Sequence, residues 1–170
     1  MELALLFLPL ISFVISGFFG KYIGDRLSEI ITSLFVSISA LLALIIFYDV
    51  IIEGYTNNVV IASWIHSGSL NVNWSIKVDA VSAVMLVVVT LISSLVHIYS
   101  IGYMSNDPHK PRFMAYLSLF TFAMLTLVTS DNFLQLFFGW EGVGLCSYFL
   151  IGFWFKKDSA NSAAIKAFVV

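Results

Sequence analysis

Five apolar stretches, each about as long as a membrane-spanning helix, dominate this sequence. A helix needs roughly 20 mostly apolar residues to cross the hydrocarbon core of a bilayer. The stretches cover residues 3–20, 30–52, 80–104, 113–129 and 133–155. Hydrophobic residues make up 60% of the 170 residues and charged residues only 11%, whereas about a quarter of the residues in a soluble domain are charged. We therefore predict an all-α integral membrane protein with about five transmembrane helices.

Two further segments lie outside these stretches. Residues 159–170, SANSAAIKAFVV, have a helical pattern, and we expect them to start a sixth helix. Residues 53–79 form a long polar connection, and its second half alternates strictly between apolar and polar residues from Leu70 to Lys77. This alternation is typical of a half-buried strand, and residues 59–65 are also strand-like. We therefore predict a short outer β-hairpin between the second and third helices, with its turn at residues 66–69.

The basic residues are distributed unequally between the two ends of the predicted helices. Six Lys and Arg residues follow the first, third and fifth stretches, at one end, and only Lys77 lies in the connections at the other end. Basic loops favour the inner side of a membrane. We therefore expect the N-terminus and the hairpin to face outward from a bacterial cell membrane or a mitochondrial inner membrane. The first stretch lacks the basic start and the cleavage pattern of a signal peptide, so it is expected to persist as a helix.

Composition also excludes several kinds of site. The net charge of −2 provides no basic field that would attract nucleic acid. The single cysteine, Cys146, excludes a disulfide within the chain and a cysteine-based Fe–S or zinc framework. No metal or redox cofactor is therefore expected in this chain.

Glu141 is the one formally charged residue in the stretch 133–155. A carboxylate at the centre of a bilayer costs between roughly 2.5 and 17 kcal/mol, and such groups usually pair with a cation or carry protons or ions. Gly139, Gly142 and Gly144 flank it, and small residues let a neighbouring backbone approach closely. We interpret Glu141 as a group that holds and releases a proton. The alternative is a neutral glutamic acid bonded to a helix backbone.

Lys166 and His97 are the other candidate proton-translocating residues. Counting along straight helices places Lys166 about 10 Å from the depth of Glu141, so we do not expect direct pairing. A water-linked relay and a snorkelling lysine both fit. The imidazole of His97 can exchange protons near neutral pH, and the alternative is a hydrogen-bonded packing residue. Asp79 and Asp131 precede helices and are predicted to be N-caps.

The segment TSDNFLQLFFGWEGVGLCSYFLIGFW, residues 129–154, closely resembles the L subunit (chain 5) family of proton-pumping NADH:quinone oxidoreductase, respiratory complex I. The segments VDAVSAVM (78–85), SLVHIYSIGYM (94–104) and AAIKAFVV (163–170), together with hairpin residues 64–74, resemble the same family. The likeness covers essentially the whole chain. The Mrp-type cation/proton antiporters share a version of the 129–154 motif.

The resemblance implies an antiporter-like fold with two inverted five-helix repeats and a long lateral helix. It identifies Glu141 with a glutamate that pairs with a lysine of a later helix, and it places Lys166 and His97 on family positions. Only the amino-terminal quarter or so of such a subunit is covered. Residues 1–111 would form its N-terminal region, and residues 112–170 the truncated start of its first proton-translocating repeat. We therefore expect an incomplete antiporter-like fold, from a truncated product, a split gene or a fragment.

The resemblance also implies a role in an enzyme complex. The chain would be a proton-pumping membrane subunit, and NADH, FMN, Fe–S clusters and quinone would bind to other subunits. Its partners would be the lipid bilayer and other membrane-arm subunits of complex I, especially the neighbouring antiporter-like ones. Two alternatives stay open. One is the A subunit of an Mrp-type Na⁺/H⁺ antiporter, and the other is an inactive truncated remnant or assembly scaffold.

Overall fold

The computed structural model describes residues 1–68 and 70–169. In chain order its elements are α1 (Glu2–Ile23), α2 (Asp25–Ile52), β1 (Asn57–Ser67), β2 (Leu70–Val78), α3 (Ala80–Tyr103), α4 (Lys110–Val128), α5 (Phe133–Ile151) and α6 (Asp158–Val169). The first five helices are long and apolar enough to cross a membrane. The prediction of five membrane helices, a short sixth helix and an intervening hairpin is therefore confirmed. Residue 69 of the predicted turn and residue 170 lie outside the described residues.

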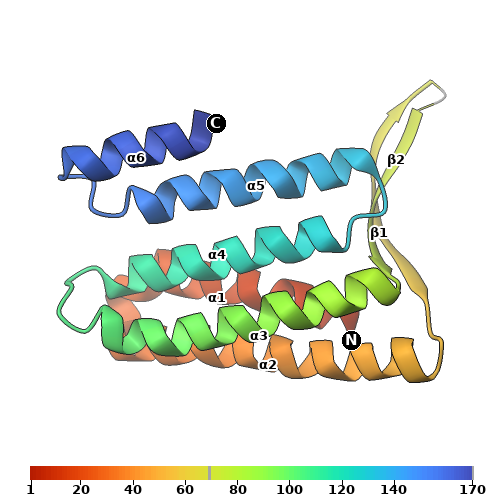
Figure 1. The fold of residues 1–170 in the computed structure, drawn as a ribbon, viewed down its shortest axis with the longest axis horizontal. Helices are drawn as coiled ribbons and strands as arrows, with labels where there is room; N and C mark the ends of the chain where they lie inside the picture. Colours follow the sequence, from red (N-terminus) through yellow and green to blue (C-terminus); the bar gives the residue numbers. More distant parts are fainter. Residues whose placement is uncertain (69, 170) are drawn as a thin grey trace.

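The helices run back and forth along the long axis of the molecule (Figure 1). α1 packs against α2 and α4, α3 packs against the same two helices, and α5 lies between α4 and α6. We call the end with the β-hairpin, the N-terminus and the α4–α5 turn the hairpin end. The opposite end, where α1, α3 and α5 finish, is called the basic end. It carries Lys21, Arg26, Lys110, Arg112, Lys156 and Lys157.

Burial is concentrated in the first four helices and the base of the hairpin. The apolar core there includes Leu6 of α1, Ile46 of α2, Leu86 of α3 and Leu125 of α4. In contrast, only Gln135, Gly139 and Cys146 are buried among the residues of α5, and only Ala164 in α6. The long apolar side chains that remain exposed on α5 fit a surface that faces lipid or further helices.

Some helix ends differ from the prediction. α2 begins at Asp25, five residues before the predicted start, because Gly24 alone separates it from α1. Gly24 has a φ of 89°, which glycine adopts without the steric penalty of a Cβ atom. α5 ends at Ile151 instead of residue 155, and Gly152 forms its C-cap. Hydropathy alone does not detect these ends, because the first turn of α2 is polar and the residues that follow α5 are mostly apolar.

One predicted cap is confirmed and the other is wrong. Asp79 caps α3 in a capping box with Ser82, whose backbone N–H donates to Asp79 Oδ1 at 2.9 Å. The N-cap of α5 is Asn132 rather than Asp131, and its Oδ1 accepts a hydrogen bond from the backbone N–H of Gln135 at 2.9 Å. Asp131 instead forms an exposed ion pair with Lys77, 3.8 Å away. An amide one residue later therefore performs the capping, which leaves the carboxylate available to the hairpin.

The hairpin is held against the α4–α5 turn by polar contacts. Gln135 bonds to both backbone groups of Ser75: its Oε1 accepts from the N–H at 3.1 Å, and its Nε2 donates to the carbonyl at 2.7 Å. The backbone N–H of Lys77 donates to the carbonyl of Thr129 at 2.9 Å. Gln135 is fully buried, so these bonds form away from water. The hairpin thereby fixes the start of α5, the helix that carries Glu141.

Candidate functional site

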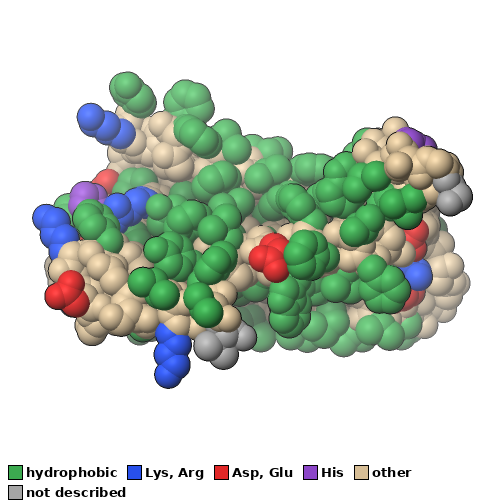
Figure 2. All heavy atoms as spheres, turned by 90° about the horizontal axis from the view of Figure 1, so that it is seen from above, with side chains coloured by type: hydrophobic (Ala, Val, Ile, Leu, Met, Phe, Trp, Pro, Cys, Tyr) green, Lys and Arg blue, Asp and Glu red, His purple; other side chains and the backbone are tan. Residues whose placement is uncertain are grey.

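Glu141 lies in the middle of α5, as the ninth of its 19 residues. Its side chain is exposed in this chain, between the exposed Phe137, Trp140 and Leu145. The expected burial of Glu141 is therefore not met within the described residues. Gly139 faces α4, and two residues further along a helix turn the direction by about 200°, so Glu141 points away from α4. Figure 2, viewed from the α5–α6 side, shows a largely hydrophobic face with an acidic group near its centre.

The glycines near Glu141 do set the approach of α4 and α5. A Cβ atom on Gly139 would lie 2.7 Å from the backbone nitrogen and the Cα atom of Leu127. A Cβ atom on Gly142 would lie 3.2 Å from the Cβ atom of Ala123. A Cβ atom on Gly144 would meet nothing within 4 Å. The predicted close approach of a neighbouring backbone is confirmed for Gly139, is weaker at Gly142 and is absent at Gly144.

Lys166 is exposed on α6. Among residues 1–68 and 70–169, the ion pair that the structure contains joins Lys77 to Asp131. Glu141 and Lys166 are thus not directly paired within the described chain. The two residues lie on α5 and α6, the helices stacked on one side of the α1–α4 group (Figure 1).

His97 is fully buried between α3 and α4. Its Nδ1 lies 2.8 Å from the carbonyl oxygen of Ser93, and its Nε2 lies 3.1 Å from Ser118 Oγ. Because a carbonyl only accepts, Nδ1 carries the proton in the neutral ring, and Nε2 accepts from the Ser118 hydroxyl. That hydroxyl can also rotate to accept from a protonated Nε2. A hydrogen-bond partner for Nε2 is therefore present in either protonation state of the ring, and a satisfied packing residue is compatible with the same geometry.

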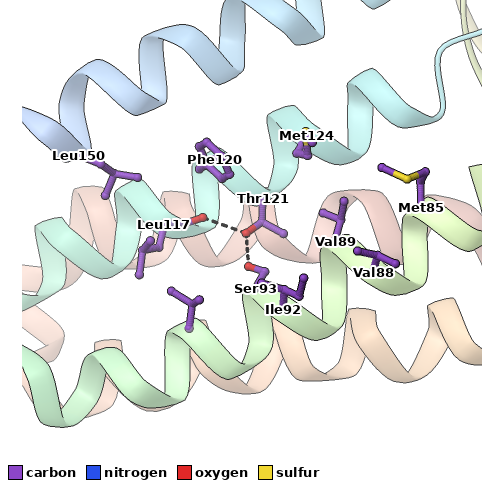
Figure 3. Close-up of a pocket in the computed structure, with 11 residues that line it drawn as sticks. Met85, Val88, Val89, Ile92, Ser93, Leu117, Phe120, Thr121, Met124 and Leu150 are labelled. Carbon is purple, nitrogen blue, oxygen red and sulfur yellow. Dashed lines mark hydrogen bonds between the residues drawn. The ribbon is translucent and has the colours of Figure 1, made fainter. Parts of the chain in front are cut away.

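A cavity of about 350 Å³ lies beside this network, between α3, α4 and the end of α5 (Figure 3). Ser93 and Thr121, whose hydroxyls are hydrogen-bonded to each other, are its polar residues. The other residues that line it are apolar, including Met85, Phe120 and Leu150. A cavity lined by apolar groups tends to stay dry. It therefore suits an apolar chain rather than a file of water, and it does not reach Glu141.

Two functional candidates were missed by the sequence analysis. Glu29 was assigned to a loop, but α2 contains it, and its side chain is buried. Gln135 was not singled out, although it joins α5 to the hairpin. The four-residue spacing of Glu29, Ser33 and Ser37 indicates a polar helix face and could have revealed the first. In the described part of the chain, no three His, Cys, Asp or Glu side chains gather closely enough to hold a metal ion.

Known proteins match the chain in two segments and also over its full length. Residues 64–114 match the family described as NADH-ubiquinone oxidoreductase (complex I), chain 5 N-terminus. Residues 130–170 match the family described as NADH:quinone oxidoreductase/Mrp antiporter, transmembrane. NADH-quinone oxidoreductase subunit L of Rickettsia conorii is 54% identical over 98% of this chain. NADH-ubiquinone oxidoreductase chain 5 of Arabidopsis thaliana is 55% identical over all of it.

The chain spans about a quarter of the length of these relatives, 25% in each case. A solved structure of the membrane-bound sulfane sulfur reductase, an archaeal respiratory membrane complex, contains a similar fold, with a TM-score of 0.80 and 19% identity. That similarity covers 99% of this chain and 34% of the other. At this identity the match supports the fold alone. The identity of 54–55% to subunit L and chain 5 proteins, over 98–100% of this chain, supports a closer relationship than a shared fold. Over essentially its whole length, this chain is therefore similar to the first quarter or so of subunit L (chain 5) proteins of NADH:quinone oxidoreductase.

Proposed function

We propose that this chain is part of a proton-translocating membrane subunit of NADH:quinone oxidoreductase. The observation that carries the proposal is the identity of 54–55% to subunit L and chain 5 proteins over essentially the whole chain. Electron transfer from NADH to quinone would take place in other subunits and drive proton movement through this one. Its neighbours would be other membrane subunits of the same complex. The Mrp-type antiporter remains a second candidate, because one matching family includes both.

In this proposal the fold divides into two functional parts. Residues 1–111 form an N-terminal region of three helices and the hairpin, and residues 112–170 begin the first proton-translocating repeat. The excess of Lys and Arg at the basic end favours an inner position for that end. The N-terminus and the hairpin then face outward.

Glu141 is the proposed proton-holding group. Its carboxylate is exposed at the middle of an apolar helix face, where contact with lipid would be costly. A polar or cationic group from a further helix would remove that cost, and the relatives are about four times as long as this chain. The lysine of a later helix that the family resemblance implies fits this role. Lys166 and His97 would then pass protons toward or away from Glu141.

The test is Glu141→Gln in the complete complex, reconstituted in vesicles. We expect the number of protons translocated per NADH oxidised to fall, because glutamine cannot exchange a proton. The matched control is Glu53→Gln, which removes an exposed carboxylate at the end of α2 and should leave the ratio unchanged. An unchanged ratio in Glu141→Gln would contradict the proposal. A sodium-dependent growth defect on deletion of the chain, without loss of NADH oxidation, would favour the antiporter.

A further inference from the structure

Glu29 is a buried carboxylate to which the proposed function gives no role. It is only 7% exposed, and it is the one acidic side chain in the buried set of the described residues. Its Oε1 atom is enclosed and has no hydrogen-bond partner there. α2 packs against α1, α3 and α4, so Glu29 is surrounded by helices that this chain itself provides.

An unpaired carboxylate oxygen in such surroundings is unstable unless it gains a proton or a water molecule. Burial of an isolated charge costs several kcal/mol even after relaxation, and buried polar groups are almost always hydrogen-bonded. Glu29 lies four residues after the start of α2, which is about 6 Å along the helix axis. Glu29 therefore lies about one helical turn from the aqueous phase at the basic end. The position suits a group that exchanges protons with the aqueous phase.

A row of hydroxyls leads from Glu29 into the bundle. Ser33 and Ser37 follow it at intervals of four residues, so the three side chains share one face of α2. The hydroxyl of Ser33 is also enclosed and without a partner in the described residues. Ser37 Oγ lies 2.7 Å from the carbonyl oxygen of Ser33 and 2.8 Å from Ser94 Oγ on α3. Each hydroxyl can both donate and accept, which a proton relay requires.

Ser94, the last hydroxyl of this row, lies close in sequence to the buried His97 of α3. Ser94 precedes His97 by three residues, so both lie on the same face of α3. The Ser37–Ser94 bond fixes the relative depth of the two antiparallel helices. Counting from it toward the basic end gives about 12 Å to Glu29 and about 4.5 Å to His97. The two groups therefore differ in depth by roughly 7–8 Å, a gap that the hydroxyl row and one or two waters can span.

We propose that Glu29 is a proton-exchange site at the basic end, connected to His97 by Ser33, Ser37 and Ser94. This inference rests on the proposed function. In one transfer, protonated Glu29 loses a proton and becomes a carboxylate, while Nε2 of His97 gains one and the ring becomes an imidazolium. The Ser118 hydroxyl then turns to accept from Nε2. Water at the basic end returns the proton to Glu29.

The experiment compares variants of the complete complex in vesicles. Glu29→Gln is expected to lower the number of protons translocated per NADH oxidised, and Glu29→Asp to restore part of the loss. Asp25→Asn is the matched control, because it removes an exposed carboxylate one turn away on the same helix and should leave the ratio unchanged. In the unmodified complex, dicyclohexylcarbodiimide, which attacks protonated carboxyl groups in apolar surroundings, should label Glu29 but not Asp25, as measured by mass spectrometry of the peptides.

The outcomes separate this inference from the proposed function. If Glu141→Gln lowers the ratio and Glu29→Gln does not, the Glu29 site is refuted and the proposed function stands. If neither variant changes the ratio, both fail. If Glu29→Gln does not assemble, Ser33→Ala decides, because it keeps the carboxylate and interrupts the row. A normal ratio in Ser33→Ala, together with an unlabelled Glu29, would overturn the proposal.

Discussion

Replacing Gly139 with alanine is expected to destabilise the α4–α5 interface. The new Cβ atom would lie 2.7 Å from the backbone nitrogen of Leu127, whereas ordinary van der Waals contact begins at 3.4 Å. The helices would therefore have to separate by about 0.7 Å, the difference between those distances. A helix backbone cannot rotate away as a flexible side chain does. Overpacking of this kind costs typically about 1–3 kcal/mol.

Gly144→Ala is the matched control on the same helix. Its Cβ atom would meet nothing within 4 Å, and alanine has a higher helix propensity than glycine by about 1 kcal/mol. Gly139→Ala gains the same propensity, so the two variants should differ by the overpacking cost alone, about 1–3 kcal/mol in the free energy of unfolding. The assay is titration of the purified chain from mild-detergent micelles into SDS, followed by circular dichroism. If Gly139→Ala is as stable as Gly144→Ala, the close approach of α4 and α5 is wrong.

Two further predictions concern the hairpin end. Gln135→Leu should leave both backbone groups of Ser75 unpaired and lower the free energy of unfolding by about 1–3 kcal/mol per buried group. Hydrogen exchange at the Ser75 amide should then accelerate. Unchanged exchange would contradict the contact between Gln135 and Ser75. The hydrogen bond from the Ser82 backbone lowers the pKa of Asp79 below its usual value of 3.8. The stabilisation is therefore complete above that value and is lost as the pH falls through the folded pKa. Asp79→Ala should cost about 1 kcal/mol near neutral pH and nothing in strong acid, as measured by unfolding at several pH values; an equal cost at every pH would contradict this.

The hairpin illustrates what the sequence could predict and what it could not. The alternation of apolar and polar residues from Leu70 to Lys77 predicts one strand and shows which residues share each of its faces. It can be read from the sequence because it involves only neighbouring residues. The register shifts between Val60 and Ala62, and between Ser63 and Ile65, carry no comparable pattern. The attachment of the hairpin to α5 depends on Gln135 and Ser75, which are 60 residues apart. A lone glutamine near the start of a helix does not reveal such a partner.

The membrane helices could be predicted because each depends on one continuous apolar stretch. Some of their predicted ends were wrong, because apolar length does not mark where a helix begins or ends. Apolar length fixes a membrane span because lipid cannot bond to the backbone. Apolar length does not detect a polar first turn such as residues 25–29. These residues are helical in the structure, where α2 begins directly after Gly24. The displaced boundary placed Glu29 in a loop. The same criterion drew attention to Glu141, since that carboxylate stands alone in an apolar stretch.

The two glutamates show why apolar surroundings in sequence differ from burial in space. α5 turns Gly139 toward α4, so Glu141, about 200° around the helix, faces outward although its sequence neighbours are apolar. α2 contacts three other helices, so Glu29 is enclosed although it lies only one turn from a polar end. Among the described residues Glu141 has no ion-pair partner, whereas the groups that surround Glu29 belong to this chain. It follows that Glu29 is enclosed by this chain itself, whereas the surroundings of Glu141 depend on whatever covers α5.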